Sequence, residues 1–323
     1  MKSGSTLEKV LASGQPAVTA ELGPPMSADG HEVVKKAQLL KGFCDAANIT
    51  DCQTAVVRIS SIAAAAIAYQ NGLEPVMQMT CRDRNRIAIQ ADLLGAAALG
   101  LKNCLCLAGD HQKFSAAGKL KGHPGAKNVY DVDTCQLVGI LKKMRDEGKQ
   151  EGGDPLEVAP QFFVGASWTP MGDPIDFRPI NLLKKVNAGA DFIQTQGIYD
   201  MELFRKQMEK IRNMGLHERT AILAGIIVPK SAMMLKYMDS SVAGVSVPKE
   251  MIDRMNKAKA AAGEDKKKMK ELQEQEGIKI AIELIQQALE TPGVKGVHIQ
   301  AIEWESAIEG IVKAAGLYPR PQV

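Results

Sequence analysis

Eight short apolar runs alternate with longer amphipathic stretches, and this alternation restricts the fold more than any other feature of the chain. The runs have the length and continuous apolar character of strands that are buried on both faces. They span residues 17–22, 45–50, 74–80, 103–109, 161–167, 191–196, 220–228 and 297–304. The helix-like stretches between them span residues 31–42, 84–100, 132–148, 180–190, 200–215 and 277–290.

Eight repeats of a strand followed by a helix predict a parallel sheet that closes into a TIM (β/α)8 barrel. The alternative is an open doubly wound sheet, but Gly-Pro-Pro follows the first run where a dinucleotide-binding fold would carry G-x-G-x-x-G. No linker divides the chain, so we expect residues 1–323 to form a single barrel domain. The dense charge run at 254–277 is interpreted as a solvated helical insertion before the last outer helix.

Composition excludes several classes of partner. The net charge of +3 gives no reason to expect nucleic acid or an anionic membrane as a partner. No apolar segment has the length of a membrane span, and the first residues lack the apolar core of a signal peptide, so we expect a cytoplasmic protein. Cys104 and Cys106 form a C-x-C pair without a second pair of ligands nearby. We therefore interpret them as reduced core thiols and expect no metal site.

Polar side chains stand at the carboxyl ends of seven of the eight predicted strands. In a barrel these ends meet at one rim, where the loops that follow the strands form the active site. The polar set includes Glu21, Asn48, Thr50, Gln78, Thr80, Asp110, Ser167, Gln194, Gln196, Gln300 and Glu303. Together these groups predict a site for a polar, ring-shaped ligand that needs several hydrogen bonds. For any one of them, the alternative is that it caps a helix or faces water.

Glu21 is the most informative member of this set, because it ends an apolar run directly before Gly-Pro-Pro. Burying an unpaired carboxylate is unfavourable, and desolvation favours its neutral form. A carboxylic acid that stays protonated near neutral pH can act as a general acid. The sequence therefore predicts an acid catalyst at the end of the first strand.

Seven motifs follow one another along the chain: 21-ELGPP-25, 48-NIT-50, 79-MTCRDRNR-86, 105-LCLAGD-110, 185-KVNAGADFIQTQ-196, 224-AGIIVP-229 and 297-VHIQAIEW-304. In this order they resemble the methylenetetrahydrofolate reductase family over residues 15–318. The resemblance implies a TIM barrel that binds a flavin, either FAD or FMN. It also implies reduction of 5,10-methylenetetrahydrofolate to 5-methyltetrahydrofolate.

The resemblance also assigns roles to single residues. Glu21 matches the catalytic glutamate, which would protonate the leaving nitrogen of the substrate's five-membered ring. Asp110 matches the aspartate beside the flavin and the pterin, where its charge would favour hydride release and stabilise a cationic iminium. Gln196 matches the glutamine that binds the folate, although a rim residue bonded to a neighbouring loop is the alternative. Trp304 stands where well-known relatives carry an arginine near the substrate tail.

For flavin binding, the resemblance points to Thr50, Gln78, Gly109, Asp110, Tyr130, Gly165, Ala166 and Lys185. Gln78 replaces a histidine of many relatives with an amide. The alternative for Lys185 is a solvated side chain on an amphipathic helix. The loop at 111–131 is long, basic and glycine-rich, which suits a cover over a phosphate-bearing cofactor.

The segment after the seventh strand departs from the family. It reads 231-SAMMLKYM-238 where relatives carry a glutamine and an aromatic residue that contact the nicotinamide cofactor. Direct use of NAD(P)H is therefore left open, with NADH binding through other contacts as one hypothesis. The other is that electrons arrive through a separate iron–sulfur or zinc subunit, as in anaerobe-type members. Methionines 233, 234, 238, 251 and 255 would help to face that subunit, although methionines at helical spacing are typical of a core. We also expect an oligomer.

Two rival functions stay open at this point. One is a pterin-binding barrel methyltransferase, which would need no flavin. The other is a non-catalytic subunit of a one-carbon enzyme complex. Retention of Glu21, Asp110 and Gln196 together favours an enzyme, because a scaffold has no need of buried acids.

Overall fold

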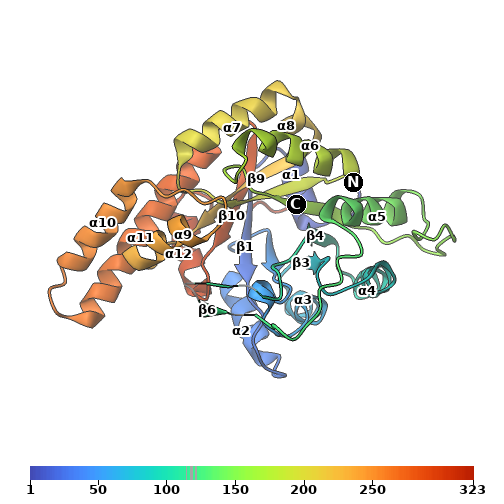
Figure 1. The fold of residues 1–323 in the computed structure, drawn as a ribbon, viewed down its shortest axis with the longest axis horizontal. Helices are drawn as coiled ribbons and strands as arrows, with labels where there is room; N and C mark the ends of the chain where they lie inside the picture. The colour runs from blue at the N-terminus through green and yellow to red at the C-terminus, as the bar shows by residue number, and fades with distance from the viewer. Residues whose placement is uncertain (114, 117–118, 121) are drawn as a thin grey trace.

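The computed structural model describes residues 1–113, 115–116, 119–120 and 122–323. Within them, eight parallel strands close into a barrel (Figure 1). In barrel order the strands are β1 (Ala17–Leu22), β2 (Ala46–Ile49), β3 (Pro75–Thr80), β4 (Asn103–Leu107), β7 (Phe163–Trp168), β8 (Phe192–Gly197), β9 (Ala221–Ile227) and β10 (Val294–Gln300). β10 pairs with β1 and closes the barrel. The predicted TIM barrel and all eight predicted strands are confirmed.

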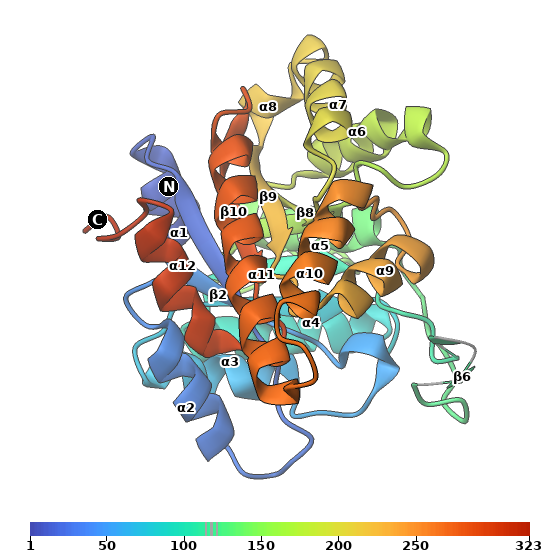
Figure 2. The ribbon, with the colours of Figure 1, turned by 90° about the vertical axis from the view of Figure 1, so that its left-hand side faces the viewer.

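Helices surround the barrel (Figure 2). Those that the sequence predicted are α2 (His31–Leu40), α4 (Arg86–Ala98), α5 (Thr134–Asp146), α6 (Arg178–Ala188), α7 (Met201–Asn213) and α11 (Lys266–Leu289). Those that it did not predict are α1 (Thr6–Ala12), α3 (Ser61–Gln70), α8 (Leu216–Arg219), α9 (Ala232–Ser241), α10 (Lys249–Ala260) and α12 (Ile308–Ala314). Short 3-10 helices are η1 (Gln53–Ala55), η2 (Ile175–Phe177) and η3 (Glu305–Ala307).

The strands separate two cores. Outward-facing side chains pack under the helices, and they include Ala20, Met77, Cys104, Cys106 and Ala166. Inside the barrel, a second cluster packs against Leu7 and Val10 of α1, and its strand residues are Ala17, Ala46, Val76, Leu105, Phe163, Phe192 and Leu223. As predicted, the two cysteines of the C-x-C pair are buried free thiols. Among the described residues, no group of three or more metal-ligating side chains is arranged to hold an ion.

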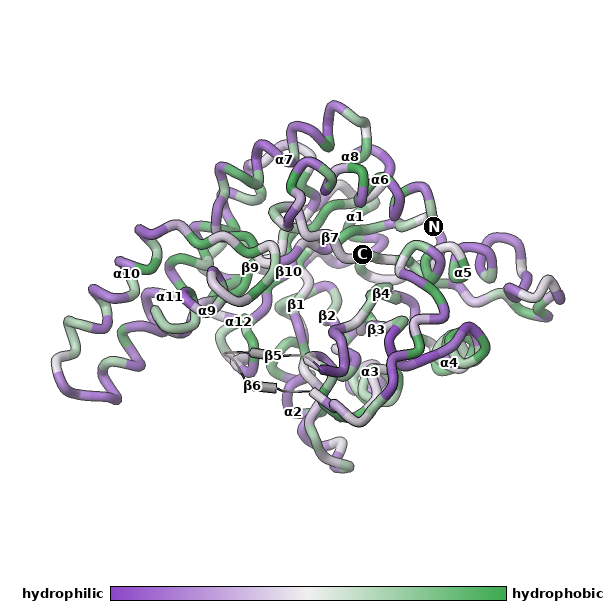
Figure 3. The backbone as a smooth tube through the Cα atoms, in the orientation of Figure 1, coloured by the Kyte–Doolittle hydropathy of each residue, from purple (hydrophilic) through white to green (hydrophobic). Residues whose placement is uncertain are grey.

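The charged insertion is largely helical, as predicted. Its first part lies in α10 (Lys249–Ala260), and its second part, from residue 266, belongs to α11 and is continuous with the helix expected at 277–290. α10 and α11 run side by side and project beyond the barrel, with a mostly hydrophilic outer end (Figures 1 and 3). Helix α11 passes through Gly277 without a break. A Cβ atom at this position would lie 1.7 Å from the carbonyl oxygen of Pro229. Gly277 therefore marks a close approach of α11 to the end of β9, and α12 is the last outer helix.

Two further expectations concern the long loop at 111–131 and the lack of a membrane span. β5 (Ser115–Ala116) and β6 (Lys119–Leu120) form a small antiparallel pair in the segment predicted to cover a cofactor, and part of that 111–131 segment lies outside the described residues. In the part of the chain that the structure describes, no helix combines the length and the apolar character that crossing a membrane requires.

Candidate active site

A cavity of about 490 Å³ opens at the carboxyl ends of the barrel strands. This volume lies within the range of roughly 300–1,000 Å³ that is typical of small-molecule sites. The polar strand-end residues that line it are Glu21, Asn48, Thr50, Gln78, Thr80, Asp110, Ser167, Gln194, Gln196 and Gln300. Of the predicted set, Glu303 is the residue that does not contribute to this lining. Barrel closure thus brings together groups that are far apart in the sequence.

Glu21 lies on β1, between the two strands that pair with it. Burial raises the pKa of its carboxyl group from 4.5 to about 7. The Gln300 amide, whose Nε2 lies 3.5 Å from Glu21 Oε2, acts in the opposite direction. The nearby charge of Glu305 raises the pKa and that of Lys36 lowers it, and these two residues form an ion pair of 2.8 Å. The carboxyl group therefore carries a proton in a large share of molecules near neutral pH.

Below Glu21, four buried side chains form a hydrogen-bonded floor. Gln194 donates to Asn48 Oδ1 at 3.0 Å and to Thr19 Oγ1 at 3.1 Å, and Asn48 Nδ2 donates to Gln194 Oε1 at 2.6 Å. His298 Nδ1 lies 3.0 Å from Thr19 Oγ1, and its Nε2 lies 3.5 Å from Asn48 Nδ2. Burial lowers the pKa of His298 to about 3, so the imidazole is neutral. The floor is polar, uncharged and internally paired.

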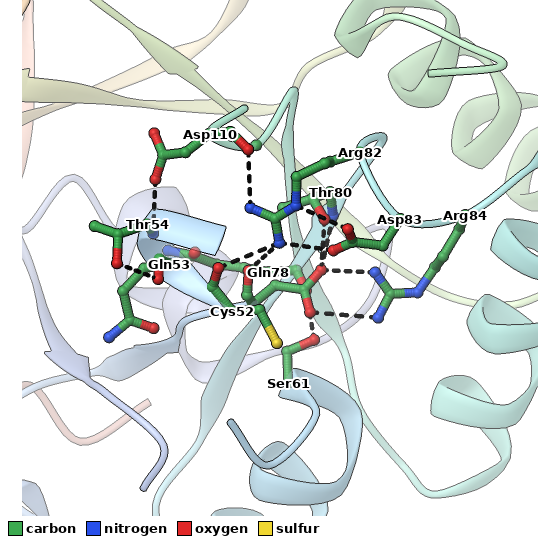
Figure 4. Close-up of polar contacts among 12 residues, drawn as sticks. Cys52, Gln53, Thr54, Ser61, Gln78, Thr80, Arg82, Asp83, Arg84 and Asp110 are labelled. Atoms are coloured by element: carbon green, nitrogen blue, oxygen red, sulfur yellow. Dashed lines mark hydrogen bonds and ion pairs between the residues drawn. The ribbon is translucent and has the colours of Figure 1, made fainter. Parts of the chain in front are cut away.

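Asp110 lies at the rim, where three loops meet, and it is exposed, so the expectation of a buried acid is wrong for this residue. Its Oδ2 accepts a hydrogen bond of 2.8 Å from the backbone N–H of Thr54. The guanidinium of Arg82 donates to the carbonyl oxygen of Asp110 at 3.1 Å and to that of Cys52 at 3.2 Å (Figure 4). Arg82 is only 2% exposed and also pairs with Asp83. This one side chain therefore ties together the loops that follow β2, β3 and β4.

The loop after β2 has an unusual backbone. Cys52, Thr54 and Ala55 have φ angles of 46°, 57° and 56°, in the left-handed region that non-glycine residues rarely occupy. The Arg82 and Asp110 contacts hold this loop in place. Sequence reasoning missed Arg82, and the only available signal was the charged stretch 79-MTCRDRNR-86 directly after a strand.

Asp51 also connects neighbouring strand ends, and the sequence analysis assigned it no role in the site. Arg84 donates to its two carboxylate oxygens at 2.7 and 3.3 Å. The backbone N–H and the hydroxyl of Thr80 both donate to Asp51 Oδ2. These contacts hold the ends of β2 and β3 together, so the buried charge of Asp51 is fully paired.

Three of the predicted flavin-binding residues besides Asp110 line the cavity. Thr50 donates to Gln53 Oε1 at 2.7 Å, and the Gln78 side-chain amide has no hydrogen-bond partner within the described ranges. Gly109, with φ of 87°, accepts a hydrogen bond of 3.0 Å from the Tyr130 hydroxyl at its carbonyl oxygen. Tyr130 is 39% exposed and lies next to the cavity rather than in its lining.

Gln196, the predicted folate ligand, also lines the cavity. Its Oε1 accepts a hydrogen bond of 3.0 Å from the backbone N–H of Gly197. This contact is local to β8, because Gly197 is the next residue of the strand, and it is not the bond to a neighbouring loop that the alternative expected. It leaves both Nε2 hydrogens without a partner among the described residues, so they can be donated to a ligand.

Four other predicted residues lie outside the cavity lining. Gly165 faces the barrel interior, where a Cβ atom would lie 2.2 Å from the Phe192 ring, and Ala166 points into the outer core. Lys185 is buried, not solvated, and donates to the carbonyl oxygen of Ser167, while burial lowers its pKa. Trp304 is partly buried, with Lys230 Nζ 5.8 Å from its ring centre. Their binding roles stay predictions.

The methionines expected to face a partner subunit do not form one surface. Met238 and Met255 are buried in the core, and Met234 and Met251 are partly buried. Met233 is 78% exposed. Methionine spacing in this region thus follows mainly the core packing of the helices.

The family model for methylenetetrahydrofolate reductase matches residues 6–316. The chain belongs to this family. The probable methylenetetrahydrofolate reductase (NADPH) of Caenorhabditis elegans is 23% identical over 81% of this chain and 35% of the relative. Methylenetetrahydrofolate reductase 1 of Schizosaccharomyces pombe is 25% identical over 76% of this chain and 36% of the relative. Methylenetetrahydrofolate reductase (NADH) 1 of Zea mays is 25% identical over 98% of this chain and 51% of the relative.

This member of the methylenetetrahydrofolate reductase family thus matches only part of the length of these curated relatives. Among solved structures, an uncharacterised protein from Clostridium thermocellum, described as binding two copies of 5-methyl-5,6,7,8-tetrahydrofolic acid, has a TM-score of 0.60. It is 15% identical, with 96% of this chain and 98% of that chain covered. At this identity the likeness supports the barrel fold alone.

Proposed function

We propose that this chain reduces 5,10-methylenetetrahydrofolate to 5-methyltetrahydrofolate with a bound flavin as the source of hydride. Family membership over residues 6–316 supports the reaction class. The observation that carries the proposal is the Glu21 carboxyl group, which lies in the cavity wall with its pKa raised to about 7. A general acid with a pKa near the working pH is what opening the substrate ring requires.

Each residue of the site has a separate role in ring opening. Glu21 gives its proton to the leaving nitrogen, and the ring opens to a cationic iminium. The Asp110 carboxylate, held by the Thr54 N–H, stabilises that positive charge from the rim. Gln196 offers its Nε2 N–H groups to the folate and orients it. The neutral His298 keeps the floor free of a second titrating group.

The cavity residues fit a flavin by their chemistry. An isoalloxazine ring carries N–H and carbonyl groups along one edge, so it needs several acceptors and donors. Gln78 has an amide without a partner among the described residues. Thr50 and the backbone at Gly109 line the same cavity. When bound, the flavin supplies the hydride.

Several finer points are also proposals. We infer that the barrel of residues 1–323 is one flavin-binding domain, and that the fold neighbour's 5-methyltetrahydrofolate is a model for the ligand of this cavity. A cytoplasmic location, an oligomeric assembly, a metal-cluster partner subunit and the choice between FAD and FMN stay predictions. NADH and an artificial donor, compared on the purified protein, would identify the electron source.

Glu21→Gln tests the proposal. We expect the variant to keep the flavin absorption spectrum and to lose folate reduction by roughly 10²–10⁴-fold, because the amide cannot donate the proton. The matched control is Glu271→Gln, at an exposed position on α11, which should reduce folate as the wild type does. Unchanged reduction by the Glu21 variant would contradict the proposed acid. A purified protein with no flavin absorption would favour the methyltransferase, and flavin without turnover would favour the non-catalytic subunit.

A further inference from the structure

Gln300 contacts the Glu21 carboxyl group directly. It ends β10, which pairs with β1 where the barrel closes, and both side chains line the cavity. Its Nε2 lies 3.5 Å from Glu21 Oε2. Its Oε1 is buried and has no hydrogen-bond partner in the described part of the chain. A buried carbonyl oxygen without a donor is unfavourable, so this atom indicates a donor on the bound ligand.

The charged groups near Glu21 are paired with other residues or with the backbone. Lys36 from α2 is paired with Glu305 from η3 at 2.8 Å, and it also donates to the carbonyl oxygen of Gly23.

The titratable groups on the other strands are also paired. His298, on β10 like Gln300, is neutral and bonded to Thr19. On the β2 side, Asp51 is paired with Arg84, and at the rim the Asp110 carboxylate accepts from Thr54.

We propose that Gln300 is a positioning residue that stabilises the state reached when Glu21 has given its proton to the leaving nitrogen of the folate. This inference rests on the proposed function. In that step the O–H bond of Glu21 breaks and an N–H bond forms on the leaving nitrogen. The C–N bond then breaks and its electron pair stays on that nitrogen. The lone pair of the other ring nitrogen forms the iminium double bond.

Both ends of the Gln300 amide match the groups that this step creates. Nε2–H donates to the newly ionised Glu21 carboxylate, and a hydrogen bond to a charged group is stronger than one to a neutral group. Oε1 accepts from the new N–H of the opened ring. Before the transfer, the leaving nitrogen is fully substituted and the carboxyl group is neutral, so neither contact is at full strength. Such contacts raise kcat and leave KM largely unchanged.

Gln300→Met removes both contacts at similar volume and tests the proposal. We expect kcat for folate reduction to fall roughly tenfold to hundredfold, with KM within about twofold of the wild type. Affinity for 5-methyltetrahydrofolate, which carries the N–H, should fall roughly tenfold, whereas affinity for the methylene form should be kept. The alkaline limb of the kcat/KM profile should move to higher pH, because the lost donor lowers the pKa of Glu21 in the wild type.

Two further variants complete the test. Gln286→Met makes the same change at an exposed site on α11 and should leave every measurement unchanged. Gln300→Glu keeps the size and an acceptor but places a second carboxyl group beside Glu21. The second negative charge should raise the pKa of Glu21, so the alkaline limb of the kcat/KM profile should again move to higher pH. This variant tests the contact if Gln300→Met fails to fold.

The outcomes distinguish a failure of the proposed function from a failure of the role proposed for Gln300. A wild-type protein that does not reduce the folate, or a Glu21→Gln variant that still does, overturns the proposed function and this inference with it. If Glu21 is essential but Gln300→Met keeps the wild-type kcat and pH profile, the inference alone is wrong. A rise in KM with kcat and the alkaline limb unchanged would make Gln300 an ordinary binding residue and would also overturn it.

Discussion

The Glu21 carboxyl group makes the stability of the folded protein depend on pH. Burial raises its pKa from 4.5 to about 7, so the folded protein retains a proton that the unfolded chain has already released. The contribution of Glu21 to the unfolding free energy is therefore full below about pH 4.5 and is lost as the pH rises through about 7. One pKa unit corresponds to about 1.4 kcal/mol, so full ionisation lowers the unfolding free energy by up to about 3 kcal/mol.

Glu21→Gln isolates this contribution, because the amide has the shape of the acid without its charge. The difference in unfolding free energy between variant and wild type, measured by urea denaturation without ligands, should grow by roughly 2–3 kcal/mol from about pH 4.5 to about pH 8. Because Glu21 is only half-buried and lines an open cavity, solvation of its carboxylate keeps the change below the upper value of about 3 kcal/mol. The exposed control Glu271→Gln should give a difference that stays constant within about 0.5 kcal/mol. A constant difference for the Glu21 variant would refute the claim that the fold holds this proton.

Two stability predictions concern the barrel interior, one its hydrogen bonds and the other its packing. Gln194→Leu should lower the unfolding free energy by about 2–4 kcal/mol, because it removes the donor to Asn48 Oδ1 and the closer acceptor of Asn48 Nδ2 from a buried amide. The double variant with Asn48→Leu should recover part of this loss in a urea-denaturation cycle, and strict additivity would contradict the network. Gly165→Ala should cost about 1–3 kcal/mol by thermal denaturation, because its methyl group would overlap the Phe192 ring. Gly139→Ala on α5, where nothing lies within 4 Å, should instead stabilise by about 0.5–1 kcal/mol, and equal effects of the two alanines would contradict the packing argument.

The strands were predictable because their signal is local. A buried parallel strand must be apolar on both faces, so each run is visible without knowledge of its neighbours. Helix α3 was missed for the complementary reason. Its sequence, SIAAAAIAYQ, is apolar on every side and carries no helical alternation of polar and apolar residues. The continuity of α11 through Gly277 was hidden as well, because the glycine is explained by a contact with Pro229, a residue distant in the sequence.

Within the candidate site, the sequence by itself determined which polar side chains stand at the strand ends. The position of Glu21 at an apolar strand end was enough to predict an acid with a raised pKa, and the strand-end rule gathered most of the cavity lining. A continuous apolar run does not reveal which of two neighbours faces inward. Only the tertiary structure decided that Gly165 faces the barrel interior and Ala166 the helices.

Only the tertiary structure also decided which groups touch. Gln300 and Glu21 are 279 residues apart, and Arg82 joins three loops from different parts of the chain. These contacts exist because the last strand pairs with the first and closes the barrel. Sequence periodicity records how each segment is buried, whereas the partners of a buried polar group depend on closure and register, which no single segment encodes.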